Sequence, residues 1–157
     1  MPTVLLALGS NLGNTSANIE RMVELINQHV GKVTAQSRTH STAPVGFSSP
    51  NMFSNAAIVV ETILPWQQVL YRTQRIEQML GRTHKNDGSG YKDRTADIDV
   101  IMFDNLVLDH AECQIPHPHF RERVFVLAPL CEVAPNATDP ISGKTVRELL
   151  HALQQKV

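Results

Sequence analysis

The chain has 157 residues, of which 42% are hydrophobic, and this composition suits one folded domain over residues 1–157. Its 14 Lys and Arg against 15 Asp and Glu leave a formal charge of −1, which argues against a general binder of nucleic acids or anionic membranes. No apolar stretch approaches the roughly 20 residues of a membrane helix, and residues 1–9 lack the basic start of a signal peptide. With Cys113 and Cys131 as the only cysteines, we expect free thiols in the cytoplasm.

Hydrophobic periodicity and turn residues divide the first two thirds of the chain into alternating elements. Thr15 or Ser16 can cap the first helix, and Gly31 and Gly81 stop the two helices of this region. Pro65 suits the first turn of the second helix. In chain order, the pattern predicts a strand over 4–8, a helix ending before 31, an edge strand over 33–41, a loop over 42–51, a strand over 53–62, a helix over 65–80, a loop over 82–93 and a strand over 94–103.

The order β-α-β-β-α-β is that of the ferredoxin-like fold, an α+β architecture with a mostly antiparallel sheet. Residues 105–108 suggest a short added strand, and residues 121–133 suggest a helix that Pro129 kinks or interrupts. A capping box at Thr145–Glu148 begins a last helix. We therefore expect a ferredoxin-like core followed by additional C-terminal helices.

An alternating acidic pair stands in the strand expected over 94–103. On a strand, Asp97 and Asp99 point to one face with Cα atoms about 6–7 Å apart, while Ile98 and Val100 point into the core. Two such carboxylates repel each other unless a divalent cation lies between them, and oxygen ligands favour Mg²⁺ with substrate phosphates. The alternative is a solvated strand face without metal, because Asp-x-Asp is common.

Basic side chains precede this acidic pair. Arg82, Lys85, Lys92 and Arg94 lie within thirteen residues of an otherwise nearly neutral chain. Arginine side chains match phosphate oxygens, so a basic loop leading into an acidic strand suits a metal-bound nucleotide polyphosphate. Ordinary solvated surface charge is the alternative.

Two further groups have both a functional and a structural interpretation. Gln74 and Glu77 share one helix face, where they can hydrogen-bond an adenine or ribose or form a surface pair. Phe53 and Phe125 offer ring faces and Asn55 offers an amide, which together suit a flat heterocycle. The two rings can equally belong to the core.

His117 lies between two prolines, so its backbone is expected to be extended and stiff. Such stiffness helps to hold a ligand, although Pro-rich turns are also ordinary. A zinc site assembled from Cys113, His117, His119 and Cys131 is disfavoured, because the spacing matches no standard structural zinc site.

Seven segments in order resemble the 6-hydroxymethyl-7,8-dihydropterin pyrophosphokinases, enzymes of folate synthesis, and Arg94–Asp99 is the most specific of them. The resemblance spans nearly the whole chain. The segments are Leu8–Gly13, Thr42–Gly46, Asn55–Ala57, Gln74–Glu77 with Gly81–Arg82, Arg94–Asp99, Ile115–Pro118 and Arg123–Leu127.

The resemblance implies transfer of pyrophosphate from ATP to the hydroxymethyl group of the pterin, giving the pterin diphosphate and AMP. It implies that Asp97 and Asp99 hold two Mg²⁺ ions bridging the triphosphate, and that Arg82 and Arg94 contact phosphates, these four being the catalytic residues. The ATP-binding residues it implies are Gln74, Glu77, Arg82, His84, Arg94, Ile98, His117 and Arg123. The pterin-binding residues it implies are Thr42, Val45, Phe53, Asn55, Asp97 and Phe125.

This chain departs from the familiar pattern at His84, which stands where some members carry a phosphate-binding arginine. A histidine is only partly charged near pH 7 and is a weaker substitute. We expect a cytoplasmic monomer whose partners are ATP and the pterin, with no nucleic acid and no membrane. The alternatives are a ferredoxin-like module that senses a nucleotide without turnover and a metal-dependent phosphohydrolase.

Overall fold

The computed structural model describes residues 1–42, 52–81 and 95–155. The strands of its main sheet are β1 (Thr3–Ser10), β2 (Lys32–Gln36), β3 (His40–Thr42), β4 (Phe53–Glu61) and β5 (Asp97–Phe103). The helices are α1 (Thr15–His29), α2 (Trp66–Met79), α3 (Val124–Val133) and α4 (Val146–Gln154), and a 3-10 turn, η1 (Phe120–Glu122), precedes α3. A small hairpin joins β6 (Leu108–Asp109) to β7 (Gln114–Ile115).

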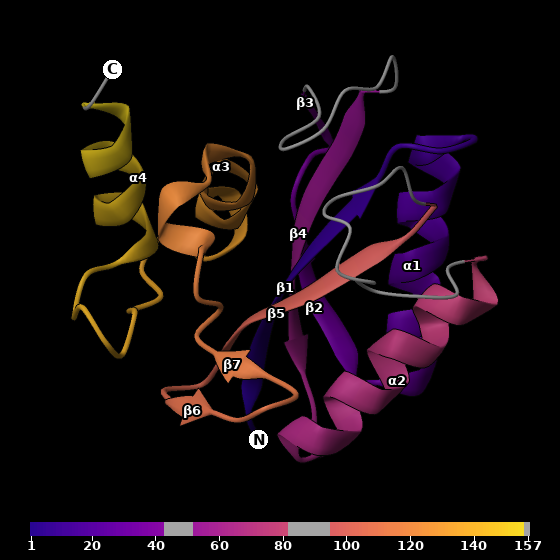
Figure 1. The fold of residues 1–157 in the computed structure, drawn as a ribbon, viewed down its shortest axis with the longest axis horizontal. Helices are drawn as coiled ribbons and strands as arrows, with labels where there is room; N and C mark the ends of the chain where they lie inside the picture. The colour runs from indigo at the N-terminus through magenta and orange to yellow at the C-terminus, as the bar shows by residue number, and fades with distance from the viewer. Residues whose placement is uncertain (43–51, 82–94, 156–157) are drawn as a thin grey trace.

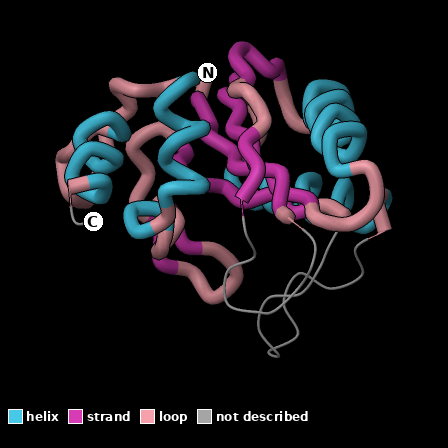
Figure 2. Tube along the Cα trace, turned by 90° about the horizontal axis from the view of Figure 1, so that it is seen from above, coloured by secondary structure: helices cyan, strands magenta, loops and turns pink. Residues whose placement is uncertain are grey.

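The strand order is β2-β4-β1-β5, with β3 paired to β4 beyond the end of β2. All these pairings are antiparallel. Helices α1 and α2 cover one face of the sheet, while α3 and α4 lie on the other (Figure 1). Seen from above, the strands lie between these helical layers (Figure 2). The ferredoxin-like expectation is confirmed, including the additional C-terminal helices.

The alternation of the strands divides the core into two clusters. Even-numbered positions of β1 and β4, and of β5 as far as Val100, pack under α1 and α2, as Leu6, Ile58 and Ile98 show. Leu5 and Ala57 face the other way and join Phe120 and the apolar side of α3. The period of two predicted this division, because successive side chains of a strand point to opposite faces. Asp97 and Asp99 therefore belong to the face that α3 covers.

The C-terminal part is fixed to this face by a buried ion pair. Asp139 is fully buried, and its carboxylate accepts hydrogen bonds from Arg121 at 2.5 and 2.9 Å and from Ser142 at 2.7 Å. Burial raises the pKa of Asp139, but the hydrogen bonds from Arg121, Ser142 and Ile141 outweigh it and bring the pKa from 3.8 to about 2. This contact ties the segment before α4 to η1, directly ahead of α3.

Several element boundaries differ from the expectation. The cap of α1 is Asn14, whose side chain accepts from Ala17 N, and not Thr15 or Ser16. The edge strand expected over 33–41 is two strands interrupted at Ser37. The added strand expected over 105–108 is displaced to β6 and pairs with β7, because Asp104 adopts a turn with φ +47°.

Pro129 lies inside α3 and is buried without ending the helix, whose first residue is Val124. The capping box of Thr145 and Glu148 is present as predicted. Gly31 ends α1 beside β4, where a Cβ atom would lie 2.3 Å from the carbonyl oxygen of Glu61. No helix within the described residues is both long and apolar enough to cross a bilayer.

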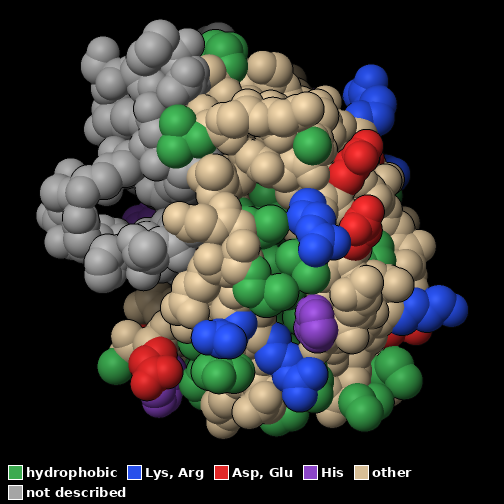
Figure 3. Space-filling model, turned by 90° about the vertical axis from the view of Figure 1, so that its right-hand side faces the viewer, with side chains coloured by type: hydrophobic (Ala, Val, Ile, Leu, Met, Phe, Trp, Pro, Cys, Tyr) green, Lys and Arg blue, Asp and Glu red, His purple; other side chains and the backbone are tan. Residues whose placement is uncertain are grey.

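The outer surface of α2 carries basic and apolar side chains together (Figure 3). A groove of about 310 Å³ there is lined by His29, Gln68, Tyr71, Arg72, Arg75, Ile76 and Met79. Arg72 donates to the carbonyl oxygen of His29 at 2.8 Å and so satisfies the C-terminal end of α1. Arg72 and Arg75 therefore line this groove on α2. Asp99 is not among the residues that line it.

Candidate active site

The acidic pair lies on β5, where the alternation predicted from the sequence is present. Asp97 and Asp99 are half-buried, whereas Ile98 and Val100 are buried against α1 and α2. In the antiparallel register, Asp97 lies opposite Gly9 of β1 and Asp99 lies opposite Ala7. Both carboxylates therefore stand on one face of the sheet, next to the smallest side chains of the central strand.

Gly9 pairs with β4 on its other side, opposite Asn55, so one row across the sheet runs from Asn55 through Gly9 to Asp97. A Cβ atom added to Gly9 would lie 3.6 Å from Asn55 Oδ1 and 3.9 Å from both Asp97 Cβ and Phe53 Cδ1. These three side chains converge above the glycine. Glycine leaves the Cβ position unfilled, and we call this space, bordered by Asn55 Oδ1, Phe53 Cδ1 and Asp97 Cβ, the hollow.

Two contacts fix the amide side of this hollow. Asn55 is buried and its Nδ2 donates to Thr42 Oγ1 at 2.7 Å. Thr42 ends β3 and pairs with Phe53 of β4. The amide carbonyl of Asn55 is the atom nearest the missing Cβ of Gly9, so it faces the hollow.

Helix α3 brings Phe125 and Arg123 to the same face of the sheet. Phe125 is half-buried in the first turn of α3 and packs against the cluster that contains Leu5 and Ala57. Arg123 caps the helix, its Cζ atom 5.8 Å from the centre of the Phe125 ring. One guanidinium and one ring thus come from the start of a single helix.

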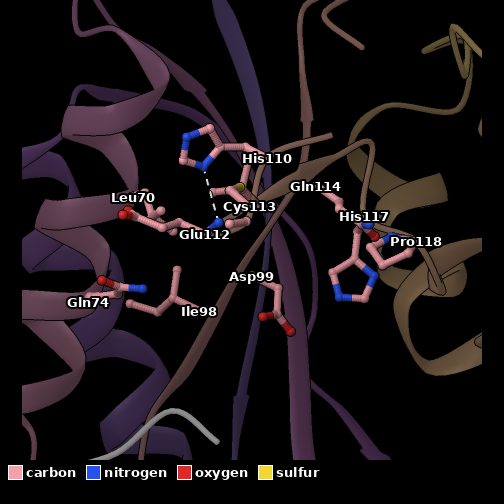
Figure 4. Close-up of a pocket in the computed structure, with 12 residues that line it drawn as sticks. Leu70, Gln74, Ile98, Asp99, His110, Glu112, Cys113, Gln114, His117 and Pro118 are labelled. Atoms are coloured by element: carbon pink, nitrogen blue, oxygen red, sulfur yellow. Dashed lines mark hydrogen bonds between the residues drawn. The ribbon is translucent and has the colours of Figure 1, made fainter. Parts of the chain in front are cut away.

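A pocket of about 330 Å³ opens beside β5, which is an end strand of the sheet. Leu70, Gln74 and Glu112 lie on one side of it and His117 and Pro118 on the other, with Asp99 between them (Figure 4). The full lining is Leu70, Gln74, Ile98, Asp99, Val100, His110, Ala111, Glu112, Cys113, Gln114, His117 and Pro118. The pocket brings together four predicted residues, namely Gln74, Ile98, Asp99 and His117.

The orientation of His117 is set by its own turn. Its backbone N–H donates to the carbonyl oxygen of Ile101 at 2.9 Å, which attaches the turn to β5. Its Nδ1 accepts from the backbone N–H of His119 at 3.1 Å. In the neutral ring the proton therefore lies on Nε2, which makes that atom a donor.

Glu77 has a defined structural contact. It is 2% exposed, and its Oε2 accepts from the backbone N–H of Ile98 at 2.7 Å. This carboxylate accepts the hydrogen bond of a backbone amide on the outer edge of β5, and the contact fixes the strand to α2. Glu77 thereby holds the backbone between the two aspartates.

Sequence reasoning missed the contribution of the β6–β7 hairpin to the pocket. His110, Glu112 and Gln114 line it, and Glu112 N donates to His110 Nδ1 at 3.1 Å. Strands of two residues carry no periodic signal, so the pattern could not place them. Cys113 packs with the α1/α2 cluster and Cys131 with the α3 cluster, so the two cysteines of the zinc alternative lie on opposite faces of the sheet.

The other predicted residues, Val45, Arg82, His84 and Arg94, lie outside the described residues.

Comparison with known proteins identifies the family. Residues 5–135 match the family model described as 7,8-dihydro-6-hydroxymethylpterin-pyrophosphokinase (HPPK). The chain belongs to the HPPK family. The match runs from β1 through α3 and so contains every residue of the site described above.

Curated relatives agree with this membership. A 2-amino-4-hydroxy-6-hydroxymethyldihydropteridine pyrophosphokinase from Porphyromonas gingivalis is 40% identical over 136 residues, covering 86% of this chain and 92% of the relative. A protein of the same name from Bacillus subtilis is 35% identical over 153 residues, covering 96% and 90%. Both relatives are matched over nearly their whole length.

Solved structures share the fold. A structure of HPPK-DHPS in complex with substrates superposes with a TM-score of 0.76 at 13% identity, and Plasmodium falciparum HPPK-DHPS with pteroate gives 0.78. Each covers 99% of this chain, which spans less than half of those longer chains, 44% and 45%. At such low identity the likeness supports the HPPK fold alone.

Proposed function

We propose that this chain performs the HPPK reaction at the face of β5, with the nucleotide beside that strand and the pterin above Gly9. Family membership makes the chain an ATP-dependent pyrophosphokinase of folate biosynthesis, which transfers pyrophosphate to the hydroxymethyl group of 6-hydroxymethyl-7,8-dihydropterin. The observation that carries the placement is the acidic pair of Asp97 and Asp99 standing between the pocket and the hollow.

The donor set of this pair fits magnesium. Asp97 and Asp99 supply oxygen atoms only. Within the described residues, no three or more His, Cys, Asp or Glu side chains are grouped closely enough to hold a metal ion by themselves. Mg²⁺ commonly takes one or two protein carboxylates and completes its octahedron with phosphate oxygens and water. Two such ions, held by the two aspartates, would neutralise charge on the triphosphate and on the bridging oxygens.

The pocket beside β5 suits the nucleotide. Its volume of about 330 Å³ lies at the lower end of the range of small-molecule sites. Leu70 and Ile98 supply apolar contact, while Gln74 and the Nε2 atom of His117 supply hydrogen-bonding groups. With the base in this pocket, the phosphates would extend past Asp99 toward Asp97, and Arg123, Arg82, His84 and Arg94 would contact them.

The hollow above Gly9 suits the pterin. The carbonyl of Asn55 can accept from the amino and ring N–H groups on the polar edge of the pterin. Thr42 holds that amide in place, and Val45 follows in the next segment of chain. The rings of Phe53 and Phe125 would stack on the two faces of the heterocycle.

The bond changes follow from this placement. The hydroxymethyl oxygen forms a bond to the β-phosphorus of ATP and loses its proton to water. The bond from that phosphorus to the oxygen shared with the α-phosphorus breaks, and AMP leaves with the electron pair. Phosphoryl-type transfer depends mainly on positioning and charge stabilisation, and the paired row from Asn55 through Gly9 to Asp97 would supply that positioning.

A labelled-ATP experiment tests the proposal. The protein is incubated with the pterin, Mg²⁺ and ATP labelled at either the α- or the β-phosphorus, and the products are separated. We expect the β label in the pterin diphosphate and the α label in AMP, in equal amounts, and no product with EDTA. Release of phosphate or pyrophosphate without a pterin product would indicate a hydrolase, and ATP binding without turnover would indicate a sensor.

A further inference from the structure

Glu132, near the C-terminal end of α3, makes a set of contacts that the site described above does not include. Its carboxylate accepts from the backbone N–H of Arg38 at 2.9 Å and from Arg38 Nη2 at 3.3 Å. It also lies 2.5 Å from Nε2 of His40, which donates to it. Burial raises the pKa of Glu132, but the hydrogen bonds from Arg38 and His40 bring it below its ordinary value, so the group is ionised near neutral pH.

These contacts are needed because the chain leaves the sheet between β2 and β3. Ser37 makes two bonds to β4: its N–H donates to Ala57 O at 2.9 Å, and its Oγ accepts from Ala57 N at 2.9 Å. The same hydroxyl donates to the carbonyl oxygen of Arg38 at 2.7 Å. The backbone N–H of Arg38 then points away from β4 and donates its hydrogen bond to the carboxylate of Glu132.

Strand β3 follows directly and is short. It has three residues, His40–Thr42, and within the described chain it pairs only with β4. So short a pairing has little stability of its own. Its start is held by Glu132 through His40, and its end is held by the hydrogen bond between Thr42 and Asn55.

Helix α3 therefore connects the two sides of the proposed pterin site. Its first turn carries Phe125, and its penultimate residue, Glu132, holds the strand that carries Thr42. We propose that Glu132 is a positioning residue for the pterin, setting the distance between the Phe125 ring and the Thr42–Asn55 pair without touching the substrate. This inference rests on the proposed placement of the pterin above Gly9.

The groups that contact Glu132 differ in their exposure to solvent. The Arg38 side chain is 82% exposed, and exposed ion pairs contribute little. The side chains of His40 and Glu132 are each only 26% exposed, and the amide of Arg38 is fixed by the backbone. The positioning should therefore depend on the carboxylate of Glu132 and hardly at all on the guanidinium of Arg38.

The test compares steady-state constants for Glu132→Ala, Glu132→Gln, Arg38→Ala and the distant surface control Glu24→Gln. Losing one or two charge-assisted hydrogen bonds should raise KM for the pterin about tenfold in Glu132→Ala, with KM for ATP unchanged within about twofold. Glu132→Gln keeps an acceptor for the Arg38 amide and should restore part of the loss. Arg38→Ala and Glu24→Gln should match the wild type.

A double-mutant cycle with Thr42→Val separates positioning from general stability. If Glu132 acts through Thr42, the two effects on KM for the pterin combine to less than their product. Three results would each overturn the inference. The first is that the Glu132 and Thr42 substitutions act independently on KM for the pterin, and the second is that KM rises equally for the pterin and for ATP. The third is that KM for the pterin is unchanged in both Glu132→Gln and Glu132→Ala. Should Glu132→Ala not fold, Glu132→Gln carries the cycle. Absence of any pterin product from the wild type would instead refute the proposed function.

Discussion

Gly9→Ala tests directly whether the pterin lies in the hollow between β4 and β5. The added methyl group would meet Asn55 Oδ1 at 3.6 Å and Asp97 Cβ and Phe53 Cδ1 at 3.9 Å, all ordinary van der Waals distances. Nothing in the protein has to move, and Gly9 is not among the glycines with positive φ. The variant should therefore fold, with stability equal to the wild type or higher by about 0.4–1 kcal/mol from the smaller entropy of the unfolded chain.

Binding of the pterin should become weaker in this variant, although the fold is as stable or more stable. A methyl group forced into a well-packed site costs roughly 1–3 kcal/mol, which corresponds to a rise in KM for the pterin of about fivefold to more than a hundredfold. KM for ATP should change little, because the pocket that we assign to the nucleotide is lined by other residues.

The assay is AMP formation at varied pterin and saturating ATP, with thermal unfolding of the same sample as a check on the fold. A Gly9→Ala variant that unfolds like the wild type and keeps its KM for the pterin would show that the substrate does not occupy the hollow. Destabilisation by more than about 1 kcal/mol would show that the methyl group is not accommodated as the distances imply.

Three other predictions follow from named contacts. Asp97→Ala or Asp99→Ala should lower kcat at least about 100-fold, because each removes charge that stabilises the transfer, while the control Glu20→Ala, at an exposed position of α1, should leave kcat and the melting temperature unchanged; a wild-type rate in either of the first two would exclude the metal assignment. Phe125→Ala should weaken pterin binding by roughly 1–3 kcal/mol through lost stacking and burial, and a titration that finds equal affinity would remove the ring from the site. The pKa of Asp139 falls from 3.8 to about 2 on folding, so its ion pair contributes roughly 2 kcal/mol above pH 4 that is lost as the pH falls toward 2. Asp139→Asn should remove that part of the acid sensitivity in denaturant titrations, and an unchanged pH dependence would contradict the assignment.

The elements with a strong local signal could be predicted from the sequence. The alternation in Asp97–Val100 placed both carboxylates on one face, because a period of two leaves no other choice when Ile98 and Val100 are buried. The capping box of α4 was equally local. The cap of α1 was misplaced by one or two residues, since Asn14, Thr15 and Ser16 are all good caps and only the backbone decides among them.

The features that were missed depend on contacts between distant parts of the chain. The break at Ser37 depends on Ala57 and on Glu132, which lie 20 and 94 residues away from their partners. No window of sequence around residue 37 contains that information, and the local composition correctly indicated a strand on either side of it. The contact of Glu77 with Ile98 N is of the same kind, because it forms only after α2 has packed beside β5.

The candidate site depends both on local sequence patterns and on contacts between distant parts of the chain. Family resemblance identified Asn55 and Asp97 as site residues, but local patterns could not show that Gly9 lies between them. That row exists because β1 is inserted between β4 and β5, with register set by the apolar alternation of all three strands. A one-residue slip of β5 would turn Asp97 and Asp99 into the core and expose Ile98, at the cost of burying two charges. The hydrophobic pattern that stabilises the sheet therefore also holds Asp97 and Asp99 on one face, and Gly9 lacks the side chain that would stand between Asn55 and Asp97 on that face.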